Sequence, residues 1–130
     1  DMPKIQAKAR ELGIADHVCF LGVRSDVADL MQAMDVFAFP SLYEGLGIAL
    51  IEAQASGLPC IVSDTIPPEA YLTDLVFSQK LSASPEGWAD AILKKRNTPR
   101  ADRSAEIAAH GFDITTEAVK LQEFYLEAYK

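Results

Sequence analysis

Two short apolar runs, VFAF at residues 36–39 and CIVS at residues 60–63, constrain the fold of this chain more than any other feature. The stretch between them is almost wholly apolar over residues 47–56 and then reaches Gly57 and Pro59, a pairing typical of a helix C-terminus. Strands joined through a helix indicate right-handed βαβ units with parallel pairing. We therefore expect an α/β fold of Rossmann-like type, with helices on both faces of a parallel sheet.

The rest of the chain continues this alternation of helices and strands. Residues 18–21 form a continuous apolar run of the kind found in strands that are buried on both faces. Capping residues and apolar spacing predict helices over residues 3–12 and 27–35. A turn is expected within residues 65–72 and a strand at 75–77. Two more helices are expected to start at Ser84-Pro85 and at Thr98-Pro99, and the second of them to end at Gly111. Residues 1–130 are thus expected to form one domain.

The last segment, residues 113–130, is expected to be a terminal amphipathic helix. Its apolar residues recur three and four positions apart, which places them on one side of a helix: Ala118, Leu121, Phe124, Tyr125 and Ala128. Such a stripe needs an apolar partner, so we expect this helix to pack against its own domain, another domain or a second copy of the chain.

Composition excludes several classes of function. The net charge of -7 argues against nucleic acid as a partner, because binding to phosphates needs clustered Lys and Arg. The two cysteines, Cys19 and Cys60, each sit in an apolar run and are expected to be buried, reduced thiols. Without an apolar run long enough to span a bilayer, we expect a cytoplasmic protein. Because the first residue is Asp1, we expect a piece of a longer protein.

The chemistry of the chain concentrates at the junction between the run at 36–39 and the following helix. Gly45 and Gly47 permit close approach of a ligand to the helix N-terminus, where free N–H groups and the helix dipole favour an anion. Two carboxylates, Glu44 and Glu52, lie on either side of this junction.

Each of these features also has an ordinary structural explanation. Two glycines can simply form a tight turn, and Glu44 can interact favourably with the helix dipole. Glu52 is the one acid in an apolar helix, so it faces a polar cleft, pairs with a cation or lies at an exposed edge. The residues alone leave these alternatives open.

The segment EGLGIALIE, residues 44–52, matches the E-x7-E pattern of retaining nucleotide-sugar glycosyltransferases with the GT-B fold, of the group 1 type that builds exopolysaccharide and lipopolysaccharide. Residues 18–22 (VCFLG), 35–48 (DVFAFPSLYEGLGI) and 52–64 (EAQASGLPCIVSD) also resemble consecutive blocks of that family's C-terminal, donor-binding domain. Roughly half of the chain carries the resemblance.

The resemblance implies a role for each matching residue. Glu44 is expected to face the donor sugar as the catalytic carboxylate, and Glu52 to bind the ribose hydroxyls. The diphosphate is expected at the backbone amides of the junction, and the base near the segment that follows Gly22. The donor-binding set is therefore Gly45, Leu46, Gly47, Ile48, Ala49, Glu52, Val23 and Arg24.

The same resemblance implies partners and missing parts. The substrates are a nucleotide-diphosphate sugar and a glycan or lipid-linked acceptor, and no metal or other cofactor is required. Family members have two further βα units, a basic pair and an acceptor-binding N-terminal domain before the position of Asp1. We therefore expect this chain to be inactive alone, to pair with a second copy through an open sheet edge, and to work at the inner face of a membrane when full length.

Two other functions fit the same residues. In a glycosidase, Glu44 and Glu52 would be the acid and nucleophile on either side of one glycosidic bond. In a non-catalytic, Rossmann-like interaction domain, replacement of Glu52 would leave binding unaltered.

Overall fold

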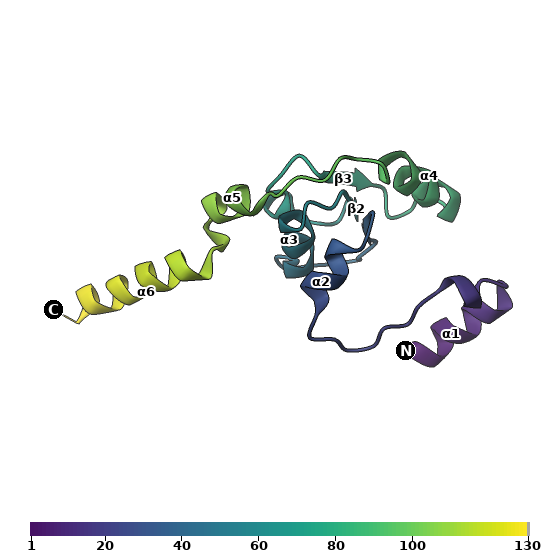
Figure 1. Cartoon of the computed structure of the whole chain (residues 1–130), viewed down its shortest axis with the longest axis horizontal. Helices are drawn as coiled ribbons and strands as arrows, with labels where there is room; N and C mark the ends of the chain where they lie inside the picture. The colour runs from purple at the N-terminus through teal and green to yellow at the C-terminus, as the bar shows by residue number, and fades with distance from the viewer. Residues whose placement is uncertain (130) are drawn as a thin grey trace.

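The computed structural model describes residues 1–129, in which a parallel three-stranded sheet is surrounded by helices (Figure 1). The strand order is β1-β2-β3. The elements are α1 (Met2–Glu11), the short turn η1 (Ala15–His17), α2 (Val27–Gln32), β1 (Phe37–Phe39), α3 (Ile48–Ala55), β2 (Cys60–Ser63), η2 (Pro68–Ala70), β3 (Val76–Gln79), α4 (Pro85–Lys95), α5 (Ser104–Ile107), η3 (Ala108–Phe112) and α6 (Ile114–Ala128). The expected α/β class is confirmed.

The main hydrophobic core lies on one face of the sheet. In register, Phe37 lies beside Cys60, and Phe39 beside Val62. Because side chains alternate along a strand, these residues point to the same face. There they pack with residues of α2, α3 and the η2 segment: Met31, Leu50, Ala53, Leu58, Ile66 and Ala70. These buried contacts fix the position of α3 over the sheet.

Helix α4 covers part of the opposite face. Phe77 lies beside Ile61 in the register of β2 and β3, and the ammonium of Lys95 sits 3.5 Å from the centre of the Phe77 ring. The Gln79 side chain on β3 donates a hydrogen bond to the Gly87 carbonyl of α4, at 3.0 Å. Helices therefore contact both faces, as the sequence predicts.

The C-terminal ends of α2 and α3 are held together by Arg100. Its guanidinium donates hydrogen bonds to the Gln32 carbonyl, to the Met31 carbonyl at 2.5 Å and to the Ser56 carbonyl at 3.1 Å. These carbonyls belong to the last turns of helices, where a cation also favours the negative end of the dipole. Arg100 thus acts as a shared C-terminal cap that the sequence analysis missed.

Residues 18–21 do not form the predicted strand. They are extended but pair with no strand of the sheet, and Cys19 and Leu21 are exposed. Figure 1 shows this part of the chain between α1 and α2, away from the sheet. A strand exists only through its hydrogen-bonded neighbour, and a run of apolar residues cannot reveal whether a neighbour is present.

The helix predicted to start at Thr98-Pro99 begins later, at Ser104. The preceding residues cross the end of α3 without forming a helix, because Arg100 is bound to three carbonyls and Ala101 packs over Gly57. The predicted end at Gly111 is confirmed as a break, since Gly111 has a φ of 84°. Tertiary contacts have overridden a local start signal here.

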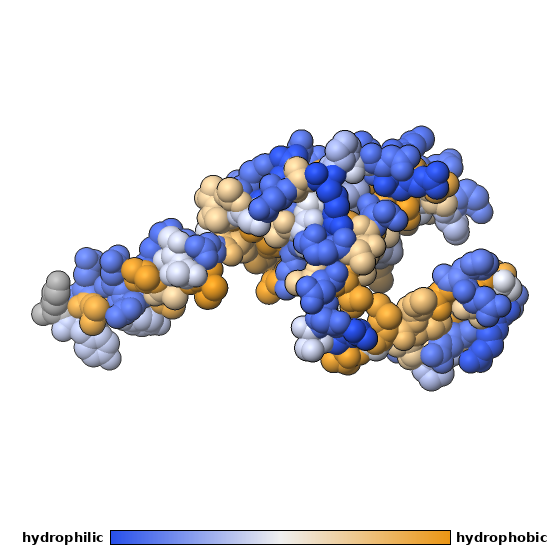
Figure 2. Space-filling view, viewed as in Figure 1, coloured by the Kyte–Doolittle hydropathy of each residue, from blue (hydrophilic) through white to orange (hydrophobic). Residues whose placement is uncertain are grey.

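Helix α6 confirms the predicted amphipathic helix, of which Lys130 lies outside the described residues. It projects from α5 and does not pack on the sheet (Figure 1). Its apolar side chains are exposed, including Leu121, Phe124 and Tyr125. Figure 2 shows hydrophobic surface on this helix and along the segment next to α1. Within residues 1–129, no helix combines the length and apolar character needed to cross a membrane.

We predict that Gly57→Ala destabilises the protein. Gly57 has a φ of 71°, and a Cβ there would lie 2.3 Å from the carbonyl oxygen of Ala101. Strain and overlap together should lower the free energy of unfolding by about 3 kcal/mol, measured by chemical denaturation. The matched control is Gly45→Ala, whose Cβ would meet no atom within 4 Å and whose φ is not positive. Equal stability of the two variants would contradict the prediction.

The cysteines should differ in reactivity. Burial raises the pKa of the Cys60 thiol to about 12, whereas Cys19 is exposed, contrary to the expectation that both are buried. The thiolate is the reactive form, so it is scarce at Cys60 at pH 8. We predict that a disulfide reagent titrates one thiol in the folded protein and two in denaturant. Cys19→Ser should abolish the native reaction, and a reactive thiol remaining in that variant would refute the assignment.

Candidate functional site

The loop between β1 and α3 brings the two predicted carboxylates to one junction. Glu44 lies half-buried in this loop, and Glu52 is the fifth residue of α3 with an exposed side chain. The loop leaves the carboxyl end of β1, the edge at which open α/β sheets bind ligands. The loop and the first turn of α3 also contain the predicted residues Gly45 to Ala49.

Gly47 sets the direction of α3. It has a φ of 72° and a ψ of 57°, a left-handed conformation that favours glycine. A Cβ there would find ordinary contacts, 3.8 Å from Phe39 and 4.0 Å from Glu44, so conformation and not space requires the glycine. A Cβ at Gly45 would meet no atom within 4 Å, which leaves open space beside the loop. The two glycines therefore serve different purposes.

The first turn of α3 exposes backbone donors. The first hydrogen bond within the turn is donated by the Leu50 N–H to the Gly47 carbonyl, at 2.8 Å. The N–H groups of Ile48 and Ala49 precede it and have no acceptor inside the helix, as at every helix N-terminus. This end of the helix carries the positive end of the dipole. The junction can therefore accommodate a negatively charged group.

The carboxylate of Glu44 is held by its own loop. Ser41 Oγ donates a hydrogen bond to Glu44 Oε1 at 2.9 Å. The Ser41 carbonyl accepts hydrogen bonds from the hydroxyls of Ser63, at 2.5 Å, and Thr65, at 2.7 Å. The loop after β1 is thereby fastened to the end of β2.

Glu52 borders a shallow apolar pocket of about 330 Å³ between α3 and the segment that follows α5. Its lining comprises Leu46, Ile48, Ile51, Glu52, Ala55, Ile107 and Phe112. Of the alternatives for Glu52, exposure beside a pocket is observed, and it forms no ion pair among residues 1–129. The sequence analysis missed Ile107 and Phe112, because a contact across some sixty positions leaves no local signal.

Val23 and Arg24 lie in a different place, before α2. Val23 is fully exposed, and Arg24 Nε donates to Asp26 Oδ1 at 2.7 Å, which lowers the pKa of the Asp26 carboxyl. Among residues 1–129, no hydrogen bond or ion pair connects Arg24 with the loop before α3. Their contribution to a binding site stays a prediction. In this described part of the chain, no three His, Cys, Asp or Glu side chains are arranged to hold a metal ion.

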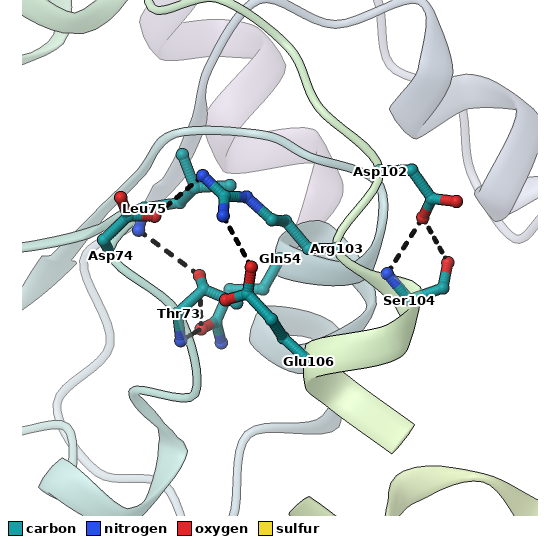
Figure 3. Close-up of polar contacts among 8 residues, drawn as sticks. All are labelled: Gln54, Thr73, Asp74, Leu75, Asp102, Arg103, Ser104 and Glu106. Carbon is teal, nitrogen blue, oxygen red and sulfur yellow. Dashed lines mark hydrogen bonds and ion pairs between the residues drawn. The ribbon is translucent and has the colours of Figure 1, made fainter. Parts of the chain in front are cut away.

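Gln54 fastens the buried side of α3 (Figure 3). Its Oε1 accepts hydrogen bonds from the N–H groups of Leu72 and Thr73, at 2.9 and 3.0 Å, and from the Thr73 hydroxyl at 3.1 Å. Its Nε2 donates to the carbonyls of Ala70, at 2.8 Å, and Leu50, at 3.2 Å. This fully buried amide joins the helix that carries Glu52 to the segment before β3.

A neighbouring ion-pair group connects the same segment to α5. Arg103 Nη2 lies 3.0 Å from Asp74 Oδ1, and Arg103 Nη1 lies 2.5 Å from Glu106 Oε1 (Figure 3). Asp74 is largely exposed, so these pairs stabilise the fold only modestly. They hold α5, and with it Ile107, beside α3.

Comparison with known proteins agrees with the blocks found in the sequence. The family described as glycosyl transferases group 1 matches residues 3–108, which is most of the chain. The chain belongs to this family. Membership favours a transferase over the glycosidase that the two carboxylates alone would also permit.

Three relatives illustrate the similarity of this group 1 glycosyltransferase domain. EpsF of Bacillus subtilis (strain 168), which carries a glycosyltransferase name, is 36% identical over 130 residues, covering 94% of this chain and 33% of EpsF. The UDP-Gal:alpha-D-GlcNAc-diphosphoundecaprenol alpha-1,3-galactosyltransferase of Escherichia coli is 44% identical over 54 residues, 42% of this chain and 14% of the relative. The lipopolysaccharide glucosyltransferase WaaG of Escherichia coli (strain K12) is 37% identical over 71 residues, which cover 55% of this chain and 19% of WaaG. The chain spans a third or less of the length of each.

We predict that Gln54→Leu destabilises the domain. The substitution replaces the amide with an apolar side chain of similar size and leaves two partly buried N–H groups and the buried Ala70 carbonyl without their partner. Unpaired buried groups should lower the free energy of unfolding by about 2–4 kcal/mol in urea denaturation. The control is Gln122→Leu on α6, an exposed amide whose change should cost less than about 0.5 kcal/mol. Similar effects of the two substitutions would contradict this role of Gln54.

Proposed function

We propose that this chain is the nucleotide-sugar-binding domain of a retaining GT-B glycosyltransferase. The reaction moves a sugar from a nucleotide-diphosphate sugar to a glycan or lipid-linked acceptor. Family membership supports the reaction class. The observation that carries the proposal is the position of Glu44 and Glu52 on either side of the open N-terminus of α3.

The diphosphate binds at the first turn of α3. The backbone N–H groups of Leu46, Gly47, Ile48 and Ala49 and the helix dipole supply the positive field. The open space at Gly45 supports close approach of the phosphates. As the bond to the sugar breaks, negative charge grows on the leaving diphosphate, and preorganised backbone donors of this kind stabilise the transition state.

The two carboxylates contact the two ends of the donor. Glu52 accepts hydrogen bonds from the ribose hydroxyls, and its exposure supports this role. Glu44 faces the sugar, where its charge stabilises the positive charge that develops at the anomeric carbon. Val23 and Arg24 border the base, and no metal is required.

The remaining parts of the reaction involve chain beyond these residues. The acceptor binds to an N-terminal domain, and this chain alone does not transfer sugar. The names of the Escherichia coli relatives include a UDP-sugar, a lipid-diphosphate acceptor and lipopolysaccharide, which support a bacterial surface polysaccharide as the product. The full-length enzyme works in the cytoplasm, at the inner face of the membrane where such acceptors are held.

We predict that one of UDP, GDP and ADP binds saturably to this chain in isothermal titration calorimetry. Glu52→Ala should weaken that binding by about 10- to 100-fold, because each hydrogen bond to a charged group contributes about 1.5–3 kcal/mol. The calorimetric signal also identifies the base.

The matched control is Glu123→Ala, which removes an exposed glutamate from α6, away from the sheet. Its affinity should equal that of the unsubstituted chain. If a nucleotide binds equally well to both variants, Glu52 does not contact the ribose. If no nucleotide binds to this chain, the titration is repeated on the full-length protein, which contains the basic pair, and absence of binding there would show that the proposed function is wrong.

A further inference from the structure

The hydroxyl groups at the end of β2 form a small cluster against the loop that carries Glu44. Phe39 and Val62 are paired in register; Ser63, the last residue of β2, follows Val62, and Ser41 lies two residues beyond Phe39 at the start of the loop. Thr65 Oγ1 lies 3.0 Å from Ser63 Oγ, and both hydroxyls meet the Ser41 carbonyl. The hydroxyls of Ser63 and Thr65 thus converge on the carbonyl of one peptide group, that of Ser41.

Ser63 is the fixed point of this cluster. Its side chain is fully buried, and a buried hydroxyl is stable only with a hydrogen-bond partner. The Ser41 carbonyl is the acceptor, at 2.5 Å. Displacement of Ser41 would leave the Ser63 hydroxyl with Thr65 Oγ1 as its one remaining partner among the described residues, so the loop position is tied to the sheet.

Ser41 passes this constraint on to Glu44. Its backbone carbonyl accepts hydrogen bonds from Ser63 and Thr65, and its hydroxyl donates to Glu44 Oε1 at 2.9 Å, with the Tyr43 carbonyl as a second acceptor at 3.1 Å. Hydrogen bonds to a carboxylate are stronger than those between neutral groups, and a glutamate side chain otherwise samples many rotamers. The second oxygen, Oε2, accepts no hydrogen bond among residues 1–129. One oxygen therefore has a hydrogen-bond partner within the loop, and the other is left to accept a hydrogen bond from a ligand.

We infer that Ser41, held by Ser63 and Thr65, positions the Glu44 carboxylate to contact the donor sugar, an inference that rests on the proposed function. Ser41 is a positioning residue, because it acts through Glu44 and does not itself touch the donor. Its contribution is preorganisation: the carboxylate is already oriented when the sugar arrives.

The test measures how much the sugar adds to binding. Calorimetry is carried out with three pairs of ligands: UDP and UDP-galactose, GDP and GDP-mannose, and ADP and ADP-glucose. For each pair, the quantity compared is the dissociation constant of the nucleoside diphosphate divided by that of its sugar derivative, and this ratio is high when the sugar adds to binding. Ser41→Ala should lower this ratio about tenfold for the pair that binds, with the affinity for the nucleoside diphosphate alone unchanged. Glu44→Gln should lower it at least as much, and the double variant no further than Glu44→Gln.

Two further variants separate positioning from folding. Thr65→Val removes a hydroxyl with little change in shape and should lower the ratio, whereas Thr65→Ser retains the hydroxyl and should preserve it. Ser82→Ala is the control for an exposed serine elsewhere. Thermal unfolding of each variant identifies any general loss of structure. Such a loss would weaken the binding of the nucleoside diphosphate and of its sugar derivative equally.

The outcomes distinguish the two proposals. A normal ratio in Ser41→Ala together with a lowered ratio in Glu44→Gln would overturn the positioning role and leave the proposed function intact. A normal ratio in Glu44→Gln would show that Glu44 does not contact the sugar, which also overturns the inference. Failure of all three nucleoside diphosphates to bind both the unsubstituted chain and the full-length protein would overturn the proposed function, and the inference with it.

Discussion

Burial of α3 against the sheet is the interaction on which the rest of the structure depends. Leu50 and Ala53 of this helix are fully buried. Gln54, on the same helix, makes hydrogen bonds to backbone groups of the segment before β3. Apolar burial supplies the main driving force, and the amide selects one position for the helix because a displaced helix would leave several buried groups unpaired. The N-terminus of α3 is therefore presented at the sheet edge with a defined direction.

This arrangement separates stability from chemistry along a single helix. The buried side of α3 holds the fold, whereas its first turn, Glu52 and the preceding loop remain accessible. The half-buried Glu44 carboxylate accepts a hydrogen bond from Ser41 within the same loop, whereas Glu52 is exposed. A ligand site can thus be built from exposed groups whose backbone is fixed by a core that lies behind them.

Much of this could be predicted from the sequence, because it depends on local patterns. The apolar runs predicted β1 and β2, and Gly57 with Pro59 predicted the end of α3. The positions of Glu44 before α3 and Glu52 within it were also predicted, because they depend on local spacing, whereas the roles of the two carboxylates stay a prediction. Residues 18–21 failed as a strand because pairing is not local, and Cys19 is exposed for the same reason.

The contacts that the sequence could not reveal connect distant positions. Arg100 reaches the ends of α2 and α3 across 44 to 69 residues, and its neighbours Thr98 and Pro99 had indicated a helix start instead. Ile107 and Phe112 join the pocket beside Glu52 in the same way. A polar residue in a loop-like segment gives no indication of which carbonyls it will meet, so these roles required the three-dimensional structure.

The bonds of Arg100 also have a mechanical consequence. One planar guanidinium bonds to the C-terminal ends of two helices, α2 and α3, at the end of α3 opposite to the loop that carries Glu44. Rotation of α3 alone would break bonds to Met31, Gln32 or Ser56. These bonds therefore oppose movement of α3 relative to α2, and they couple the position of the α3 N-terminus to that of its neighbouring helix.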